Sequence, residues 1–372
     1  TDIFSPYILI YLNFIFNDAI PFLFFYPDVP ENIQYTTFTA AIINLSFLFL
    51  FRKQAQVPIS INLPLSSIKL NKKRKILLSC FVFFLLWAGV MSGVLINLLR
   101  GNNIEDLRRT SEIGVGVIRD IPMLGIQIIM LVLFLQKTWK CYYKVVAFYS
   151  FCLSVFLFLT TGNKGGVLVG VTLFLLFFHL KKRGFKWYEY VLYYLAMPLA
   201  AGTLQGIRGG DLTLIASQIA VFFSYPVILY QANSIPIMNA VGTENFFWGE
   251  EYYTGLVKFI PRFLWPDKPL SFDYKLKELA NYDFEGGGIY TTLCNDLYIN
   301  FGYYYFIFYI LWLLFIHYLY GMVMDDKRFY YSRIIALFII LMGGIASTIG
   351  SCEILLLFLL FLILYYSRVK TL

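Results

Sequence analysis

Residues 303–324 read Y-Y-Y-F-I-F-Y-I-L-W-L-L-F-I-H-Y-L-Y-G-M-V-M, a run without Asp, Glu, Lys or Arg. A helix of about 20 apolar residues spans the hydrocarbon core of a bilayer. Nine other runs approach or reach this length; they lie at 7–26, 34–51, 76–99, 117–136, 145–162, 166–180, 187–204, 332–350 and 353–367. Together the runs predict an all-α polytopic membrane protein with about ten transmembrane helices.

The composition excludes most soluble classes. Hydrophobic residues make up 59% of the chain and charged residues 14%, whereas soluble proteins carry about 25% charged residues. The sequence pI is near 9.0, and the positive-inside rule explains this excess of basic residues without nucleic acid. Five cysteines form no C-x-x-C motif, and neither of the two histidines has a ligand partner at helical spacing. We therefore predict no metal site and no cofactor.

Basic clusters predict the orientation. Residues 52–75 carry seven basic residues and no acidic one, and smaller basic clusters follow the fourth, sixth, eighth and tenth runs. The positive-inside rule places all of these clusters in the cytoplasm. This predicts ten crossings with both chain ends inside, and no cleaved signal peptide. The predicted spans carry few charges apart from Asp18.

The long segment 205–302 then begins and ends outside. It contains ten acidic and six basic residues, which fits an exterior position. Its apolar run 213–230 cannot be a single crossing, so we predict a re-entrant or interfacial helix there. Irregular backbone at membrane depth is tolerated only in protein or beside a wet cavity. We expect one membrane domain, 1–372, with 205–302 as a loop subdomain over an outward-facing cavity.

Four polar segments on this exterior side are candidate site segments. They are T-G-N-K-G-G at 161–166, G-I-R-G-G-D at 206–211, F-I-P-R-F-L-W-P-D-K-P at 259–269, and the stretch from E-G-G-G at 285–288 to D-L-Y-I-N-F-G at 296–302. Glycines let the backbone approach an anion, arginine matches phosphate geometry, and prolines stiffen a loop. Plainer interpretations stay open: a Gly-rich turn, a snorkelling lysine, an Arg–Asp or Asp–Lys pair that closes the loop, and an ordinary acid at a helix N-terminus.

Cations from these segments and from the loop at 100–120 are expected to face outward near membrane level. That arrangement suits a membrane-anchored phosphate or pyrophosphate. Aromatic residues of the long loop stack well on sugar rings, although aromatic belts are also common at membrane interfaces. A carboxylate in the same region is a candidate general base, with Asp296 the first choice and Asp211 the second.

The order of motifs resembles a known family. R-G-G-D at 208–211, I-P-R-F-L-W-P-D-K-P at 260–269, G-G-G at 286–288 and T-L-C-N-D-L-Y-I-N-F-G at 292–302, ahead of a span, are similar to the oligosaccharide repeat-unit polymerases, the O-antigen polymerase (Wzy-type) family. The resemblance covers about 161–302. The family has T-G-x-R-G where this chain has Lys164, and L-G-E-x-Y where it has C-N-D-L-Y at 294–298. Lysine loses the bidentate geometry of arginine, and aspartate has a shorter reach than glutamate.

The resemblance implies a multi-span, GT-C-like glycosyltransferase that is independent of metal. It would transfer a glycan from an undecaprenyl-pyrophosphate donor to a lipid-linked repeat unit at the outer face of the bacterial cytoplasmic (inner) membrane, making an O-antigen or capsule-like polysaccharide. The implied partners are those lipid-linked oligosaccharides, membrane lipids and a chain-length regulator, without nucleic acid. The expected catalytic residues are Arg208, Arg262, Asp296 and Asp211; the expected substrate-binding residues are Arg119, Lys164, Lys268, Trp265, Tyr298 and Asn300.

Two rival functions stay open. An O-antigen ligase performs the same class of reaction with another acceptor, but ligases typically rely on an exterior histidine, and His179 and His317 lie toward the predicted cytoplasmic side. A flippase or exporter of lipid-linked sugars is not an enzyme of this kind. It should show inverted repeats and charges along a path through the bundle.

Overall fold

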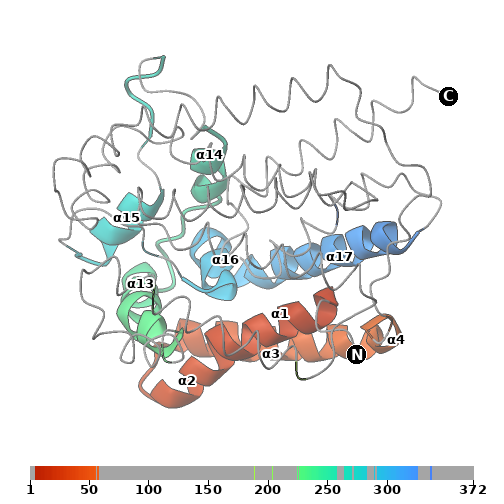
Figure 1. The fold of residues 1–372 in the computed structure, drawn as a ribbon. Coiled ribbons are helices and arrows are strands. Elements are labelled where there is room, and N and C mark those ends of the chain that lie inside the picture. The colour runs from red at the N-terminus through yellow and green to blue at the C-terminus, as the bar shows by residue number, and fades with distance from the viewer. Residues whose placement is uncertain are drawn as a thin grey trace. The chain divides into compact units, whose positions relative to one another are not determined.

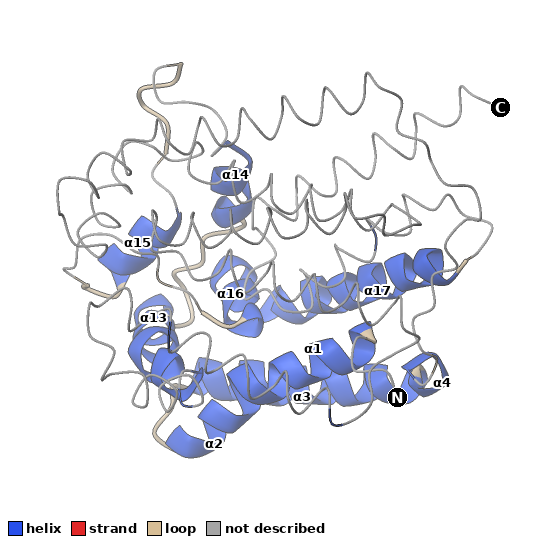
Figure 2. Ribbon diagram, viewed as in Figure 1, coloured by secondary structure: helices blue, strands red, loops and turns tan. Residues whose placement is uncertain are grey.

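The computed structural model describes residues 5–55, 57, 188, 203, 224, 226–257, 264–269, 272–282, 289, 291–325 and 336. Within these residues every regular element is helical (Figures 1 and 2). The chain divides into two compact units, and the unit formed by 1–61, 224–284 and 288–372 holds all described residues except Tyr188 and Thr203. The count of ten spans, the single membrane domain with its loop subdomain, and most of the run 213–230 lie outside the described residues and stay predictions.

Three helical segments are long and apolar enough to cross a membrane: Pro6–Phe25, Glu31–Leu50 and Leu293–Met324. The first consists of α1 (Pro6–Phe14), the π-helical turn η1 (Ile15–Ala19) and α2 (Ile20–Phe25). The second is α3 (Glu31–Leu50), which is followed by the short α4 (Arg52–Ala55). The third contains α16 (Leu293–Phe301), η4 (Gly302–Tyr304) and α17 (Tyr305–Met324). These segments confirm the predicted runs 7–26, 34–51 and 303–324 as helices.

Proline accounts for the two π-helical turns. Pro21 follows η1, and Pro236 follows the second turn, η3 (Tyr230–Ser234), which leads into α13 (Ile235–Val241). Proline donates no backbone hydrogen bond, and its ring crowds the carbonyl four residues earlier. A local widening to π geometry relieves this crowding without ending the helix, and such turns are frequent at functional sites.

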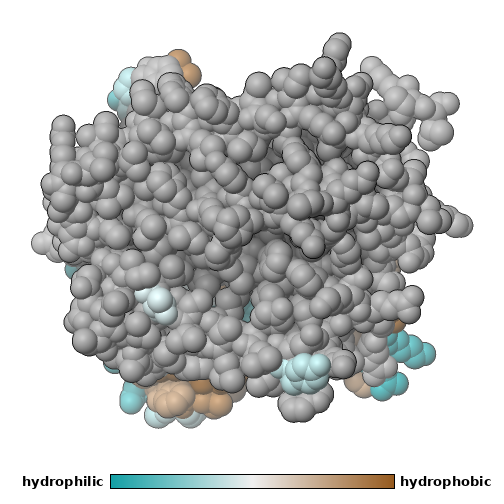
Figure 3. Space-filling model, viewed as in Figure 1, coloured by the Kyte–Doolittle hydropathy of each residue, from teal (hydrophilic) through white to brown (hydrophobic). Residues whose placement is uncertain are grey.

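The two faces of α3 show how these helices meet their surroundings. Exposed apolar side chains follow helical spacing on one face, at Phe38, Ile42, Leu45 and Phe49. The opposite face buries small and polar residues, at Asn32, Thr36, Ala40 and Asn44. A soluble helix has the reverse pattern, and Figure 3 shows brown, apolar side chains at the lower left, where Figure 1 draws α2 and α3. The chain is therefore a membrane protein with its apolar face turned toward lipid.

The three spans have fixed relative directions. At one end Tyr7 of α1 packs on Phe51, which follows α3, and on Tyr320 of α17. At the other end the Tyr305 hydroxyl donates to the Thr36 carbonyl at 2.7 Å. Hence α3 and α17 run parallel and α1 runs opposite to both (Figure 1). The predicted order of crossings also has the second and eighth spans running in the same direction and the first span in the opposite direction.

The third span is not one straight helix. Cys294 of α16 lies within interaction distance of Tyr309, although a straight helix would separate these residues by about 22 Å. The rings of Phe301 and Phe308 stack with their centroids 3.7 Å apart. The chain therefore turns back at Gly302, where φ is +58° and a Cβ atom would lie 2.6 Å from the ring of Phe246. Only glycine fits this left-handed, crowded position.

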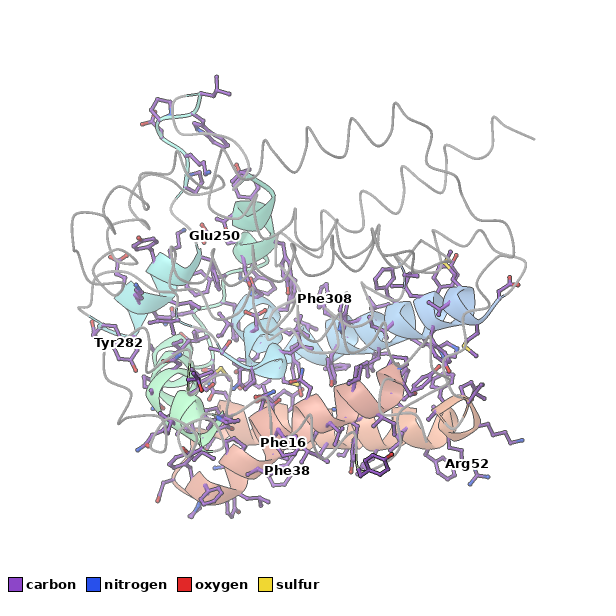
Figure 4. The ribbon with its side chains drawn as sticks, viewed as in Figure 1. Phe16, Phe38, Arg52, Glu250, Tyr282 and Phe308 are labelled. Carbon is purple, nitrogen blue, oxygen red and sulfur yellow. The ribbon has the colours of Figure 1, made fainter. Side chains whose placement is uncertain are left out.

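Three further helices come from the long loop: α13, α14 (Glu250–Val257) and α15 (Phe272–Leu279). α13 contacts α3, α15 and α16, and α14 contacts α15. An ion pair between Lys275 Nζ and Glu250 Oε1 also joins α15 to α14, and Figure 4 labels Glu250 at the start of α14. This part of the predicted loop subdomain is thus a small helical assembly next to α16.

Candidate functional site

Every residue from Thr291 to Asn300 is buried, so α16 is enclosed on all sides. The sequence explains why a helix forms here. Thr292 is the N-cap, and its hydroxyl accepts a hydrogen bond from the Asn295 amide at 3.4 Å. Asp296 lies in the first turn, where the helix dipole favours an acid. Gly302 ends the helix by adopting a positive φ.

The side chains of α16 are unusually polar for an enclosed helix. Asn295 and Asn300 are 0% exposed and Asp296 is 2% exposed. Burying an amide or a carboxyl is costly unless hydrogen bonds replace those made to water. The hydrogen-bond partners of these groups therefore indicate the function of α16.

Asp296 belongs to a buried cluster that we call the acidic cluster: Glu251, Tyr252, Asp296 and Asn300. The Asn300 Nδ2 donates to Glu251 Oε2 at 2.9 Å and to the Asp296 carbonyl at 3.0 Å. The pKa of Tyr252 is raised above its usual range, first by burial and then by the charges of Asp296 and Glu251. Tyr252 is thus neutral beside two carboxyl groups, and its hydroxyl has no hydrogen-bond partner. Such a cluster has the chemistry to take a proton from a hydroxyl group.

A second set of contacts fastens α16 to its neighbours. The Thr36 hydroxyl donates to Asn295 Oδ1 at 2.9 Å, and the Tyr298 hydroxyl donates to the Gly242 carbonyl at 3.2 Å. Asn32 Nδ2 donates to the same Gly242 carbonyl at 3.1 Å. These bonds join α16 to α3 and to the end of α13. They place Tyr298 among packed side chains, with its hydroxyl directed at the backbone.

Asp18 is the third buried acid, and it lies in the π-helical turn η1 with 4% of its surface exposed. Thr292, the N-cap of α16, lies within hydrogen-bonding reach of its carboxylate, and Cys294 and Tyr230 lie within electrostatic range. The Asp18 Oδ1 atom has no hydrogen-bond partner. Among the described residues no basic side chain forms an ion pair with it.

The energies indicate that an ionised Asp18 would be poorly compensated. Desolvating a buried carboxylate costs several kcal/mol even after the protein relaxes. A helix N-terminus returns about 0.3–2 kcal/mol, and one hydrogen bond to a charged group about 1.5–3 kcal/mol. These gains, together about 2–5 kcal/mol, are of the same order as the cost, so a proton or a bound cation would stabilise the carboxyl further.

The predicted site residues fall into three groups. Asp296, Tyr298 and Asn300 come together on α16. Trp265 and Lys268 are half-buried in a turn that the Lys268 amide closes by donating to the Trp265 carbonyl at 3.2 Å. Five lie outside the described residues and stay predictions: Arg119, Lys164, Arg208, Asp211 and Arg262.

The structure places three residues beside α16 that are not among the predicted site residues: Asp18, Tyr230 and Glu251. Asp18 carried a usable signal, because an ionisable residue inside a predicted span is a functional candidate by default. Glu251 carried none, since it is one of ten acids in a long loop. Its contact with Asn300 joins residues 49 positions apart, and spacing along the chain does not predict such a contact.

Comparison with known proteins yields no relative: no family model, no curated protein and no solved structure matches the chain. In the part of the chain that the structure describes, no group of three or more His, Cys, Asp or Glu residues is placed to hold a metal ion. The site must therefore be interpreted from its own chemistry. That chemistry is a set of buried carboxyl, amide and hydroxyl groups around one short helix.

Proposed function

We propose that this protein is a GT-C-like glycosyltransferase that polymerises lipid-linked oligosaccharide repeat units, of an O-antigen or capsule-like polysaccharide, at the outer face of the bacterial cytoplasmic membrane. One observation carries the proposal. The segment 292–302, which resembles the family motif, holds Asp296 in a buried cluster with Glu251 and Tyr252. An acid that only favours a helix N-terminus needs no such enclosure. Buried acids with close ionisable neighbours are characteristic of functional sites.

In the proposed reaction Asp296 is the general base. Its carboxylate removes the proton from a hydroxyl of the acceptor sugar, and that oxygen attacks the anomeric carbon of the donor glycan. The bond from this carbon to the pyrophosphate oxygen breaks, and the pyrophosphate leaves with the bonding electrons. Arg208 and Arg262, assisted by Arg119, stabilise the developing negative charge, as fixed cations do in phosphoryl chemistry. Asp211 is the alternative base.

The neighbours of Asp296 have supporting roles in this scheme. Asn300 Nδ2 donates to Glu251 Oε2 at 2.9 Å, and this bond fixes α16 against α14. Its second bond, to the Asp296 carbonyl at 3.0 Å, lies within α16 and holds the Asn300 side chain in place. Tyr252 stays neutral and offers an O–H donor beside the carboxylates. Because Asp296 is 2% exposed, the side chains around it must move before an acceptor sugar contacts it.

The remaining assignments complete the proposal. The donor and acceptor are undecaprenyl-pyrophosphate-linked oligosaccharides that lie in the membrane with its lipids, and a chain-length regulator is a further proposed partner. Lys164 and Lys268 contact the pyrophosphate, and Trp265 contacts the sugars. Tyr298, an expected substrate-binding residue, is 0% exposed and donates to the Gly242 carbonyl, so its role is to fasten α16. The scheme needs no cofactor and no nucleic acid.

The test is polymer formation by the purified full chain given defined lipid-linked repeat units, read by mass spectrometry. Asp296→Asn keeps the shape of the side chain and removes the base, so we expect polymer to fall by about 10²-fold or more. Asp28→Asn removes an exposed carboxyl between α2 and α3, outside every candidate site segment, and is the matched control. Undiminished polymer from Asp296→Asn would contradict the assigned base. Transfer to a different acceptor only would indicate a ligase.

A second candidate, a flippase or exporter of the same lipid-linked sugars, is favoured by one observation. Asp18 and Asp296 are buried carboxyls carried on interrupted helices, at the π-helical turn η1 and on α16. Carboxyls and broken helices of this kind mark ion and substrate pathways in transporters. Movement of lipid-linked sugar across vesicles, without polymer in detergent, would identify this function.

A further inference from the structure

Three buried polar atoms near the start of α16 have no hydrogen-bond partner. They are Asp18 Oδ1, Thr37 Oγ1 and the Tyr230 hydroxyl. Their residues are 4%, 5% and 1% exposed, so bulk solvent does not reach them. Buried polar atoms are normally hydrogen-bonded. Three such atoms in one neighbourhood indicate a bound group that completes their bonding.

The three residues come from different elements and converge. Asp18 lies in η1, Tyr230 in η3 and Thr37 in α3. Tyr230 interacts with both Asp18 and Thr37, and Thr292 of α16 lies within hydrogen-bonding reach of Asp18. One carboxylate and three hydroxyl groups are therefore linked as neighbours: Thr292 to Asp18, Asp18 to Tyr230, and Tyr230 to Thr37. Two of them are carried on π-helical turns, which recur at functional sites.

Among the residues that the structure describes, the groups that face Asp18 do not balance its charge. The titratable side chains toward Asp18 are Tyr230 from η3, Cys294 from α16, and Tyr305 and Tyr309 from α17. All four are neutral or negative in every protonation state. The positive dipole end of α16 compensates only part of a full charge. The missing component is thus a small positive charge that accepts oxygen partners.

We propose that Asp18, Thr37, Tyr230 and Thr292 form a binding site for a monovalent cation, either a proton or a sodium ion, within the helix bundle. A carboxylate with hydroxyl oxygens suits hard cations, whereas transition metals prefer imidazole and thiolate ligands. Interrupted helices form comparable sodium and proton sites in transporters. The site does not depend on the proposed polymerase activity. One of its ligands, Thr292, is the N-cap of α16 and lies four residues before Asp296.

The experiment is thermal unfolding of the purified full chain in detergent, at acidic and alkaline pH, with NaCl or N-methylglucamine chloride at equal ionic strength. If sodium is the ligand, NaCl raises the wild-type Tm at alkaline pH by about 2–4 °C over N-methylglucamine chloride. If the proton is the ligand, the wild-type Tm falls by a similar amount as the pH rises, and NaCl adds nothing.

Two variants separate this site from other ionisable groups. Asp18→Asn imitates the neutral acid and removes the response to pH and sodium. Asp28→Asn changes an exposed carboxyl just beyond α2 and keeps the wild-type response. Equal responses of the wild type and Asp18→Asn to both pH and sodium would overturn the proposal.

A measurement on the wild type covers the case in which Asp18→Asn fails to insert. Dicyclohexylcarbodiimide modifies protonated carboxyl groups in apolar surroundings, and peptide mass spectrometry locates the product. We expect modification of Asp18 that decreases as the pH rises, with added protection by NaCl if sodium binds. Modification of Asp18 that is insensitive to both pH and sodium would exclude the site.

Discussion

The two ends of the bundle formed by α1, α3 and α17 treat buried polar groups differently. At one end, here the aromatic end, Tyr7, Phe51, His317 and Tyr320 pack together. The Tyr7 hydroxyl and His317 Nδ1 share a hydrogen bond of 2.6 Å, and the Tyr320 hydroxyl donates to the Gln54 and Val57 carbonyls. The hydroxyls of Tyr7 and Tyr320 are thus satisfied at this end, although the buried Ser5 Oγ at the start of α1 has no partner.

At the other end, here the polar end, α16 turns back toward Asp18, and buried atoms of Asp18, Thr37 and Tyr230 lack hydrogen-bond partners. The same three helices thus hold an aromatic end whose tyrosine hydroxyls are satisfied, with one unpaired hydroxyl at Ser5, and a polar end that gathers three unpaired atoms, one of them on a carboxyl group. Membrane proteins keep intramembrane carboxyls mainly for function. The difference teaches that hydrogen-bond satisfaction, rather than polarity alone, separates a structural cluster from a candidate site.

The largest effect is expected from removing the turn that builds the polar end. Gly302→Ala places a Cβ 2.6 Å from Phe246 at a φ of +58°, so we expect a loss of about 2–4 kcal/mol in stability. Gly321→Ala is the matched control, because a Cβ there meets nothing within 4 Å. It should be neutral or stabilising by about 0.5–1 kcal/mol. Unfolding in detergent measures both, and equal stability of the two variants would refute the tight turn.

A smaller effect is expected within the acidic cluster. Asn300→Ala removes the 2.9 Å hydrogen bond to the Glu251 carboxylate, which should cost about 1.5–3 kcal/mol. It should also lower polymer formation, because α16 is no longer held against α14. Asn44→Ala, which removes the partner of the Tyr309 hydroxyl, controls for loss of a buried amide away from Asp296. Full polymer formation by the Asn300→Ala protein would show that Asn300 is not needed for activity.

Removing a tyrosine hydroxyl should have different effects on stability at the two ends. Tyr7→Phe deletes a hydrogen-bonded hydroxyl and should cost about 0.5–1.5 kcal/mol. Tyr230→Phe deletes a hydroxyl with no partner, so in buffer without sodium at alkaline pH it should leave stability unchanged or increase it. Unfolding of both variants under that condition tests the comparison. Equal destabilisation would mean that the two ends do not differ.

The smallest effect is expected from Tyr252 at alkaline pH. Burial, followed by the charges of Asp296 and Glu251, raises its folded-state pKa above that of the unfolded chain, which is about 10. The folded state then holds the Tyr252 proton more tightly than the unfolded chain does. The folding stability linked to this proton is fully present below about pH 10 and is lost as the pH rises further. Tyr252→Phe should flatten the alkaline decline in Tm and change nothing at neutral pH. An unchanged alkaline slope would contradict the position of the Tyr252 hydroxyl, which is buried and close to the two acids.

Much of the described fold is predictable from local sequence. The apolar runs located α1–α2, α3 and α17 to within a few residues, because span length and hydropathy are local properties. Pro21 and Pro236 explain the two π-helical turns by the same local logic. The candidate base Asp296 and the neighbouring Asn300 were also identified from the motif at 292–302, although their roles stay predictions.

The remaining features depend on contacts between distant residues. The turn at Gly302 is set by Phe246, and the enclosure of Asp296 by Glu251 and Tyr252. Asp18 was noticed as an isolated charge, but its place beside Thr292 joins the first span to the third described one. No spacing rule relates such positions. The acid was therefore predictable as a candidate, and its surroundings were not.

The most direct test of the account is to map where substrate binds. A lipid-linked repeat unit carrying a photoreactive group would be irradiated with the purified protein, and the modified peptides located by mass spectrometry. We expect adducts in α14 and α16, around Glu251 and Asp296, that unlabelled lipid-linked substrate suppresses. Adducts confined to the aromatic end, around Tyr7, Phe51 and His317, would contradict it.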